Sequence, residues 1–525
     1  MEQHGFSEGY AYVKEGILKG TVEDGVHIFR GVPYAKPPVG ELRWRDPEPP
    51  AKWFGVRPAD RYSAGALQWD ILESQDPFAS YELGAPMHSE DCLYMNIFSP
   101  AQSTEEKLPI FVWVHGGGMV AGSGMATFFE GEKLAKEGMI VAVINYRLGL
   151  FGFFCHPELS AESPHHSCGN YGILDIRQAV KWLKENARAF GGDPDRITVG
   201  GQSGGSLGTT TLALSPLMEG LCQSYIMESG CPLYGFMQAA DGKEMERKGE
   251  EIAKSIGAPH ISDLRAMDGC DLIKIFYTEK HYIPNFSVDG YVLPDTPWNL
   301  LHQGKICHAN LLLGVTSEEF GSLAPYKSGC VTAEGFETYL KKVFTPEEAA
   351  YLGAYYPHTE GDDPVRAALR IQGDIHAMGP MLMGKLAADA GRNTYVYYKT
   401  RPDSGSRGEL LGSTHSSELP FLFDRPQKCI INPCGMDEGD IQFGKQLRSY
   451  WANFIQSGDP NVGSPVPVEW KAYKEMFDYL DLGREIHRPS EEEKEIFRYL
   501  WAIVQKHGEC TVREFQTADI SPVIS

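Results

Sequence analysis

The chain has 525 residues, of which 42% are hydrophobic, a share that is ordinary for a globular protein with a large buried core. Its formal net charge is -22 at pH 7. Such a charge repels phosphate backbones and anionic membrane surfaces, so nucleic acids and membranes are poor candidate partners, although an acidic surface also serves simple solubility.

The first residues, MEQHGFSEGYAYVKEG, lack the basic and apolar regions of a signal peptide, and no run of about 18 apolar residues predicts a membrane span. The 11 cysteines are an odd number with irregular spacing, which favours reduced thiols over a disulfide framework. No grouping of histidines and cysteines has the paired spacing of a zinc site. We therefore expect a cytoplasmic protein without a bound metal.

Short apolar or β-branched runs recur along the chain, as expected for strands buried on both faces of a sheet. The predicted strands are 110–114, 140–146, 196–200, 224–229, 310–315 and 394–399. Helical patterns alternate with them. The pattern over 174–190 predicts a helix that ends at Gly191, and Ser490 with Glu493 predicts a capping box for a helix that closes at Gly508. This alternation predicts an α/β protein with a central, mostly parallel sheet flanked by helices.

The chain shows no internal repeat, low-complexity tract or obvious linker, so we expect a single catalytic domain over 1–525. Two stretches, roughly 61–86 and 238–280, have weaker patterning and are predicted to be excursions over the sheet. Such segments either cover an active site or only decorate the surface, and the pattern leaves both possibilities open.

A serine boxed in by glycines, in TVGGQSGGSLG, follows the predicted strand 196–200 directly. A sharp turn between a strand and a helix would hold Ser203 in a strained backbone geometry and lift its hydroxyl above the sheet edge. Only small neighbours fit such a turn, which accounts for Gly201 and Gly205. The alternative interpretation is an ordinary glycine loop.

A second glycine cluster, HGGG, follows the predicted strand 110–114. Consecutive glycines let backbone N–H groups turn toward a ligand, and a developing oxyanion needs such donors. The candidate donors are Gly117, Gly118 and Gly204. A flexible turn is the alternative, but it does not explain why a glycine cluster follows a predicted strand twice.

A serine nucleophile needs a base and a carboxylate that orients the base. In the strand–turn–helix architecture, the chain order is nucleophile, acid and histidine. Glu318 and Glu319 follow the strand 310–315, and His415 follows the strand 394–399, so all three lie where parallel strands end. The pattern by itself leaves both glutamates open and offers 16 histidines.

Several long segments, among them SEDCLYMNIFSP, NYRLGLFGFF, GNYGILDIRQAVKWLKENARAFGGDPDRITVGGQSGGS and WANFIQSGDPN, resemble type-B carboxylesterases in sequence and in order. This family is the cholinesterase-like branch of the α/β-hydrolase superfamily, and the resemblance covers most of the chain. It implies an α/β-hydrolase fold with large insertions that cover the active site. It also implies the catalytic residues Ser203, Glu319 and His415 and the oxyanion donors Gly117, Gly118 and Gly204. Ser229 matches a serine that supports the triad in relatives, and an ordinary buried hydroxyl is the alternative interpretation.

The sequence departs from the family pattern at several positions. Gln202 precedes the nucleophile where glutamate is usual, so one buried charge is missing. Cys92 lacks the upstream cysteine with which it pairs in secreted relatives, which supports the cytoplasmic prediction. Glu82 stands where cholinesterases have a tryptophan for quaternary ammonium, so choline esters are disfavoured. Phe320 replaces the usual glycine after the acid. Met119, Phe320 and Phe421 are candidates for the pocket wall, with core packing as the alternative.

The sequence therefore predicts a carboxylic ester hydrolase that forms an acyl-enzyme on a small-molecule ester and needs no metal or organic cofactor. The alternative substrate class is an aryl or hydroxycinnamoyl (feruloyl-type) ester, and thioesters, lactones and amides remain open. A non-catalytic cholinesterase-like binding protein is the alternative of another class, disfavoured because all three triad positions are present. The pattern specifies no oligomeric state.

Overall fold

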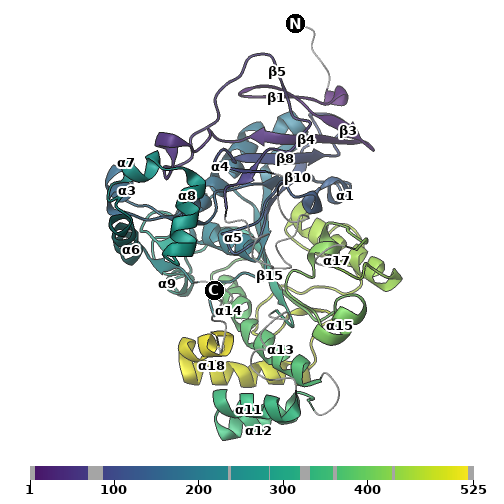
Figure 1. The fold of residues 1–525 in the computed structure, drawn as a ribbon. Helices are drawn as coiled ribbons and strands as arrows, with labels where there is room; N and C mark the ends of the chain where they lie inside the picture. Colours follow the sequence, from purple (N-terminus) through teal and green to yellow (C-terminus); the bar gives the residue numbers. More distant parts are fainter. Residues whose placement is uncertain are drawn as a thin grey trace. The chain divides into compact units, whose positions relative to one another are not determined.

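The computed structural model describes residues 6–68, 85, 87–234, 238–282, 284–319, 332–358, 363–428 and 432–517. The chain folds into two compact units, each with its own strands and helices (Figure 1). Unit 1 comprises Met1–Met227, Gln238–Asn310 and Arg448–Ser464, and unit 2 comprises Glu228–Met237, Leu311–Leu447 and Pro465–Ser525. A single domain over the whole chain stays a prediction.

The main strands of unit 1 are β3 (Thr21–Glu23), β4 (Val26–Pro33), β8 (Tyr94–Ser99), β9 (Leu108–Val114), β10 (Ile140–Ile144), β11 (Gly192–Gln202) and β12 (Ser224–Glu228). They lie side by side in the order β3-β4-β8-β10-β9-β11-β12. β10 and β11 pair with β9 in parallel, and β8, β4 and β3 continue the sheet as antiparallel strands. The predicted strands of this unit are thus confirmed.

Within the described residues, unit 1 also contains one three-stranded and two two-stranded sheets outside this one. They are β1 (Tyr10–Val13), β2 (Gly16–Lys19) and β5 (Val56–Pro58), then β6 (Gly65–Ala66) with β7 (His88–Ser89), and β13 (Ala240–Asp241) with β14 (Ser287–Val288). Its α-helices are α1 (Glu132–Ala135), α2 (Gly149–Phe153), α3 (Pro157–Glu162), α4 (Tyr171–Asn186), α5 (Gly204–Leu214), α6 (Gly242–Ser255), α7 (Ile261–Ala266), α8 (Gly269–Lys274) and α9 (Pro297–His302). Other helical turns are η1 (Phe6–Glu8), η2 (Gly40–Leu42), η4 (Thr127–Phe129), η5 (Ala187–Phe190), η6 (Pro216–Met218) and the π-helix η7 (Ile275–Glu279).

The helix predicted over 174–190 is confirmed with a tighter last turn. α4 buries Ile176, Ala179 and Leu183 on its inner face, and η5 continues it to Phe190. Gly191 then adopts a φ of 79°, the left-handed conformation that favours glycine after a helix end. The apolar periodicity and this glycine explain why the helix lies where the sequence placed it.

The predicted excursion 238–280 forms packed helices. α6, α7 and α8 bury residues such as Met245, Leu264 and Leu272 in an apolar cluster with Trp44 and Phe154. Arg43 stabilises the end of α7, because its Nη1 donates hydrogen bonds to the carbonyls of Leu264 and Met267 at 2.9 Å each. Most of the other predicted excursion, 61–86, lies outside the described residues. The role of either segment as a cover stays a prediction.

A buried ion pair links α4 to the loop after β10. Asp175 accepts hydrogen bonds from Nε and Nη2 of Arg147 at 2.7 Å each and from its backbone N–H at 3.0 Å. Both side chains are almost completely buried. Removing one partner of such a pair leaves an uncompensated charge in the core.

Replacing Asp175 with alanine should lower the free energy of unfolding by about 3–5 kcal/mol because Arg147 loses its counter-ion in the core. The measurement is a chemical denaturation curve monitored by circular dichroism. The matched control is Asp195→Ala, which removes an exposed partner of Lys184 and should change stability by less than about 1 kcal/mol. Equal, small effects in the two variants would contradict the prediction.

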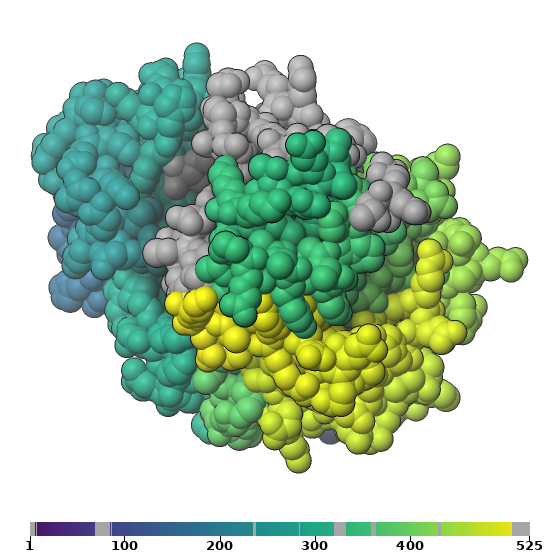
Figure 2. All heavy atoms as spheres, turned by 90° about the horizontal axis from the view of Figure 1, so that it is seen from below, coloured from purple at the N-terminus to yellow at the C-terminus, as the bar shows by residue number. Residues whose placement is uncertain are grey.

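The strands of unit 2 are β15 (Asn310–Thr316), β16 (Thr394–Lys399), β17 (Leu480–Leu482) and β18 (Ile486–His487). β15, β16 and β17 are parallel neighbours, and β18 pairs with β17 in the antiparallel direction. The helices are α11 (Ala333–Val343), α12 (Pro346–Tyr355), α13 (Asp363–His376), α14 (Met378–Asp389), α15 (Gly405–Leu411), α16 (Leu419–Leu422), α17 (Glu438–Ser457) and α18 (Glu491–Thr517), and α17 continues into unit 1 from Arg448. Figure 2 shows α11–α13 in green beside the yellow α18 on one face of unit 2.

The start of the last helix is confirmed and its predicted end is wrong. Glu493 accepts hydrogen bonds from the N–H and hydroxyl of Ser490, and the Ser490 hydroxyl accepts one from the N–H of Glu493, which is a capping box. The helix does not close at Gly508 but continues to Thr517. A glycine inside a helix costs only about 1 kcal/mol relative to alanine, so it need not end one.

Among the helices of the described ranges, none combines the length and the apolar character that a membrane span requires.

Candidate active site

Ser203 occupies the turn between β11 and α5. Its φ of 57° and ψ of -124° lie in a region that costs free energy for a residue with a side chain. A Cβ atom at Gly201 would lie 2.6 Å from the carbonyl of Gly205 and 2.8 Å from the Val114 oxygen. These backbone atoms are therefore close enough to exclude any side chain at position 201. The turn has the strand–serine–helix order expected for a nucleophile.

The loop after β9 brings amide nitrogens to the start of α5. Gly117 and Gly118 have φ values of 102° and 61°, and the Gly117 carbonyl accepts hydrogen bonds from Val120 and Ala121. A Cβ atom at Gly204 would lie 2.8 Å from the Gly118 nitrogen and 2.6 Å from the Met119 nitrogen. Amides gathered at a helix N-terminus provide partial positive charge for an anionic oxygen.

The residues beside the serine carry no formal negative charge. The side chain of Gln202 is buried, and a Cβ atom at Gly116 would lie 3.1 Å from its Oε1. Burial lowers the pKa of His115 to about 4, although a hydrogen bond with the Gly116 carbonyl opposes this effect. His115 is therefore neutral near pH 7, and Gln202 adds no buried carboxylate to this turn.

In unit 2, the structure pairs Glu319 with His415. Nδ1 of His415 shares a hydrogen bond with Oε2 of Glu319, and the Thr316 N–H donates to Oε1 at 3.2 Å. Glu319 is buried, whereas about a third of the His415 side chain is exposed. The pair leaves Nε2 as the nitrogen of His415 that can exchange a proton with a substrate or a nucleophile.

Electrostatic coupling separates the pKa values of this pair. Burial by itself would raise the pKa of Glu319, but the charge and hydrogen bond of His415 lower it to about 2, with a further contribution from His376. Burial likewise favours neutral His415, yet the Glu319 carboxylate raises its pKa above the ordinary value. The acid is therefore ionised at every physiological pH, and the imidazole is poised to take up a proton.

The two adjacent glutamates have different contacts. Glu318 accepts a hydrogen bond from the Ser413 N–H at 2.7 Å, and its backbone bridges Thr414. Glu318 thus contacts the chain just before His415, whereas Glu319 contacts the imidazole. The Ser229 hydroxyl contributes to the low pKa of Glu319, although the buried Ser229 oxygen forms no hydrogen bond of ordinary geometry with the described residues.

The candidates for the pocket wall lie in different surroundings. Met119 is buried with a φ of 60°, and its Cε would lie 3.9 Å from a Cβ atom at Gly208. Phe421 is buried in unit 2 and packs edge to face on Phe443 at a ring distance of 4.9 Å. Phe320, like Glu82, lies outside the described residues. A pocket wall made by these side chains stays a prediction.

Sequence patterns did not reveal three buried ionisable groups near the Glu319–His415 pair. His376 interacts electrostatically with both members of the pair. Burial raises the pKa of Glu418 to about 7, and no side chain in the described part of the protein forms an ordinary hydrogen bond with its carboxylate oxygens. Lys399 is fully buried and donates to the hydroxyls of Ser413 and Ser417 on either side of His415. Single buried charges have no periodicity, so no sequence signal identifies them.

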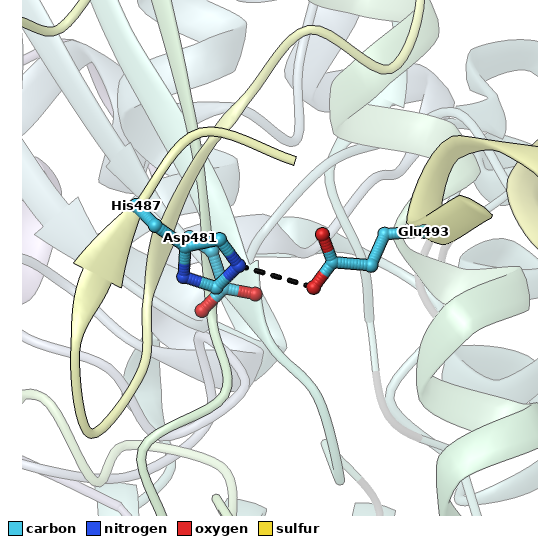
Figure 3. Close-up of side chains that lie close together, drawn as sticks. All are labelled: Asp481, His487 and Glu493. Carbon is cyan, nitrogen blue, oxygen red and sulfur yellow. Dashed lines mark hydrogen bonds and ion pairs between the residues drawn. The ribbon is translucent and has the colours of Figure 1, made fainter. Parts of the chain in front are cut away.

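One group of side chains in the described ranges has the composition of a metal site. Ligand atoms of Asp481, His487 and Glu493 lie within 4.8 Å of one another (Figure 3). His487 Nε2 is 3.0 Å from Glu493 Oε1, and the Ser490 N–H donates to the other oxygen of Glu493 at 2.7 Å. Burial lowers the pKa of His487, but the hydrogen bond with Glu493 and nearby charges raise it overall. Protein groups thus account for this cluster as an ion pair between β18 and α18.

A serine at a strand–helix turn, amides at a helix N-terminus and a buried glutamate–histidine pair define the α/β class of serine hydrolases. The chain belongs to the carboxylesterase family, whose model matches residues 8–497. It is 32% identical to fumonisin B1 esterase of Sphingopyxis macrogoltabida over 496 residues, which covers 90% of this chain and 86% of that protein. It is also 32% identical to carboxylesterase 5A of Canis lupus familiaris over 503 residues, covering 91% of this chain and 85% of that protein.

A solved structure supports the same assignment. The carboxylesterase EST55 of Geobacillus stearothermophilus matches with a TM-score of 0.78 and 29% identity, covering 94% of this chain and 100% of that one. The predicted α/β-hydrolase fold and the predicted family are therefore confirmed. The protein is a carboxylic ester hydrolase of the serine type that acts on small-molecule esters.

Proposed function

We propose that Ser203, His415 and Glu319 are the nucleophile, base and acid of a two-step acyl transfer. Nε2 of His415 accepts the Ser203 proton while the serine oxygen bonds to the ester carbonyl carbon. The carbon–oxygen bond to the alcohol then breaks, and His415 gives its proton to the leaving alcohol. Water repeats the sequence on the acyl-enzyme, which releases the carboxylic acid and restores Ser203.

The hydrogen bond between Glu319 and Nδ1 of His415 is the observation that carries this proposal. It selects the tautomer that carries its proton on Nδ1, so that Nε2 is the nitrogen that accepts the Ser203 proton, and the ionised acid stabilises the imidazolium that forms during attack. The Ser203 turn supports the nucleophile, since a strained serine at a strand–helix junction has a cost that a plain loop would avoid.

The backbone amides of Gly117, Gly118 and Gly204 are the proposed donors to the oxyanion. The nearness of the Gly118 nitrogen to Gly204 supports two of them. Each preorganised donor lowers the barrier by roughly 3 kcal/mol because it needs no reorientation when the charge develops.

We propose simple carboxylic esters as the substrate class, with aryl or hydroxycinnamoyl esters as the alternative. The similarity to a fumonisin B1 esterase adds fumonisin B1 to the candidates. The test is a panel of p-nitrophenyl esters of increasing acyl length, methyl ferulate and fumonisin B1, with organophosphate labelling in parallel. A kcat/KM that is highest within the p-nitrophenyl acyl series disfavours hydroxycinnamoyl esters, whereas a clear preference for methyl ferulate supports them. Absence of both turnover and labelling would refute the proposed mechanism.

The kcat/KM for p-nitrophenyl acetate should fall as the pH drops through the pKa of His415, because the protonated ring cannot accept the Ser203 proton. The free imidazole titrates near about 6.5, and the Glu319 carboxylate raises this pKa, so the midpoint of the acid limb should lie above that value. Initial rates in buffers of constant ionic strength measure it. A midpoint clearly below about 6.5 would contradict the assigned pair.

We also propose that the enzyme works in a reducing compartment such as the cytoplasm. Cys92 is a buried free thiol, and burial raises its pKa, which makes it unreactive. Protein denatured and alkylated at the moment of cell lysis should carry the alkyl label on all 11 cysteines. A smaller number, caused by disulfides, would contradict this proposal.

A further inference from the structure

A fully buried lysine lies at the carboxyl end of β16, the strand that precedes the His415 loop. Lys399 is the last residue of this strand, and its side chain is completely inaccessible. Thr316 of β15 is its register partner in the parallel pair. Lys399 therefore lies at the same sheet edge as the glutamates that follow β15, the edge where parallel sheets carry functional residues.

The ammonium group uses each of its donors inside the protein. Nζ donates to the hydroxyls of Ser413 and Ser417 at 2.8 Å each and to the Arg401 carbonyl at 2.9 Å. A lysine ammonium has three N–H donors, so these bonds satisfy it fully. Ser413 and Ser417 lie two residues before and two residues after His415. Two of the three bonds thus end on the loop that carries the imidazole.

Buried carboxylates hold the same loop from other sides. Glu318 accepts from the Ser413 N–H at 2.7 Å, and Asp403 accepts from the N–H of Thr414 at 3.2 Å and from its hydroxyl. Burial lowers the pKa of Lys399, whereas Asp403 and Glu418 oppose this effect with their charges. The lysine and these carboxylates together form a charged frame around residues 412–417.

Burying a lysine costs desolvation free energy, which a side chain that only fills space would avoid. An apolar side chain of similar length would fill the same space without the desolvation cost of an ammonium. The lysine adds directed bonds to two points that straddle His415. Such bonds restrict how far the loop can move relative to β16, and hence relative to Glu319 at the end of the neighbouring strand.

We propose that Lys399 is a positioning residue that holds the loop 412–417 through Ser413 and Ser417, so that the His415 ring stays on the Glu319 carboxylate. The inference rests on the proposed function of His415 as the catalytic base. Lys399 touches no reacting atom in this account and acts only through the loop.

The first test is the variant Ser413→Ala/Ser417→Ala, which removes two acceptors and keeps the lysine charge. We expect kcat for p-nitrophenyl acetate to fall about 10- to 100-fold with KM nearly unchanged, because a misplaced base slows the chemistry rather than binding. The acid limb of kcat/KM should move to lower pH, because Glu319, which raises the pKa of His415, would be held less closely.

The second test is a cycle with Lys399→Met. Lys399→Met should lower kcat by a similar factor. The triple variant Lys399→Met/Ser413→Ala/Ser417→Ala should lose no more than Lys399→Met or the double serine variant, since all three changes break the same bonds between Lys399 and the loop. The triple variant also leaves no unpaired ammonium, so it decides the question if a parent is unstable. Lys341→Met, an exposed lysine on α11, is the matched control and should keep the wild-type kcat.

Variants that unfold at lower temperature but keep the wild-type kcat and acid limb would overturn the positioning role and leave Lys399 as a structural residue only. Losses that multiply in the triple variant would overturn it as well. Labelling of the wild-type protein by an organophosphate separates the two hypotheses. If Ser203 is not labelled, the proposed function fails, and if it is labelled normally, a negative result concerns Lys399 alone.

Discussion

Replacing Ser203 with alanine should lower kcat for p-nitrophenyl esters by about 10⁶-fold, the size of effect seen when a serine hydrolase loses its nucleophile. Alanine removes the only atom that bonds to the acyl carbon and keeps the small size that the turn requires. The proposed oxyanion donors Gly117, Gly118 and Gly204 remain, so a residual acceleration over water is expected from oxyanion stabilisation and binding alone.

The measurement combines turnover with the mass of the labelled protein. Wild-type enzyme treated with an organophosphate should gain one adduct on Ser203, and the alanine variant should gain none. Ser255→Ala, at the exposed end of α6, is the matched control and should keep both turnover and labelling. An alanine variant with more than a tenth of the wild-type kcat, or an adduct on another residue, would refute the assignment of the nucleophile.

Replacing Glu319 with glutamine should lower kcat by about 10⁴-fold, the loss that follows when a triad carboxylate becomes an amide. The amide can donate to Nδ1 of His415, which stabilises the tautomer with a proton on Nε2. That tautomer cannot accept the Ser203 proton. The variant also removes the charge that raises the pKa of His415, so burial dominates and the acid limb should move to lower pH.

Glu318→Gln is the informative comparison because the two glutamates are neighbours with different contacts. Glutamine at 318 keeps an acceptor oxygen for the Ser413 N–H, so its loss of kcat should be far smaller. Circular dichroism and thermal unfolding establish that both variants are folded. The assignment of Glu319 as the acid would be wrong if kcat fell further in Glu318→Gln than in Glu319→Gln. It would also be wrong if the acid limb did not move in Glu319→Gln.

The strands and the turn at Ser203 were predictable because their signals are local. Strands such as 310–315 and 394–399 are continuous apolar runs, and the structure has β15 and β16 there. Glycines flank Ser203 because nearby backbone leaves no room for a Cβ atom at their positions, and this constraint is visible in the sequence of the turn itself. The end of α18 was missed because one glycine is a weak signal against a helix whose other residues favour it.

The choice between the adjacent glutamates was less accessible. Both follow β15, and residue type and spacing do not distinguish them. Family resemblance favoured Glu319, and the structure gives the physical difference: its carboxylate bonds to His415, whereas that of Glu318 bonds to the backbone of Ser413. Only the paths of two chain segments about a hundred residues apart decide which carboxylate meets the ring.

By itself, the sequence determined the α/β pattern, the strained serine turn, the glycine amides and the set of residues from which a triad could be built. These follow from periodicity and backbone sterics, which act between residues close in the chain. Tertiary structure alone decided that His415 is held by Glu319, that its pKa is raised, and that Lys399 with Glu318 and Asp403 frames its loop. Those properties depend on burial and on contacts between distant segments, because the strength of a charge interaction is set by the surroundings that folding creates.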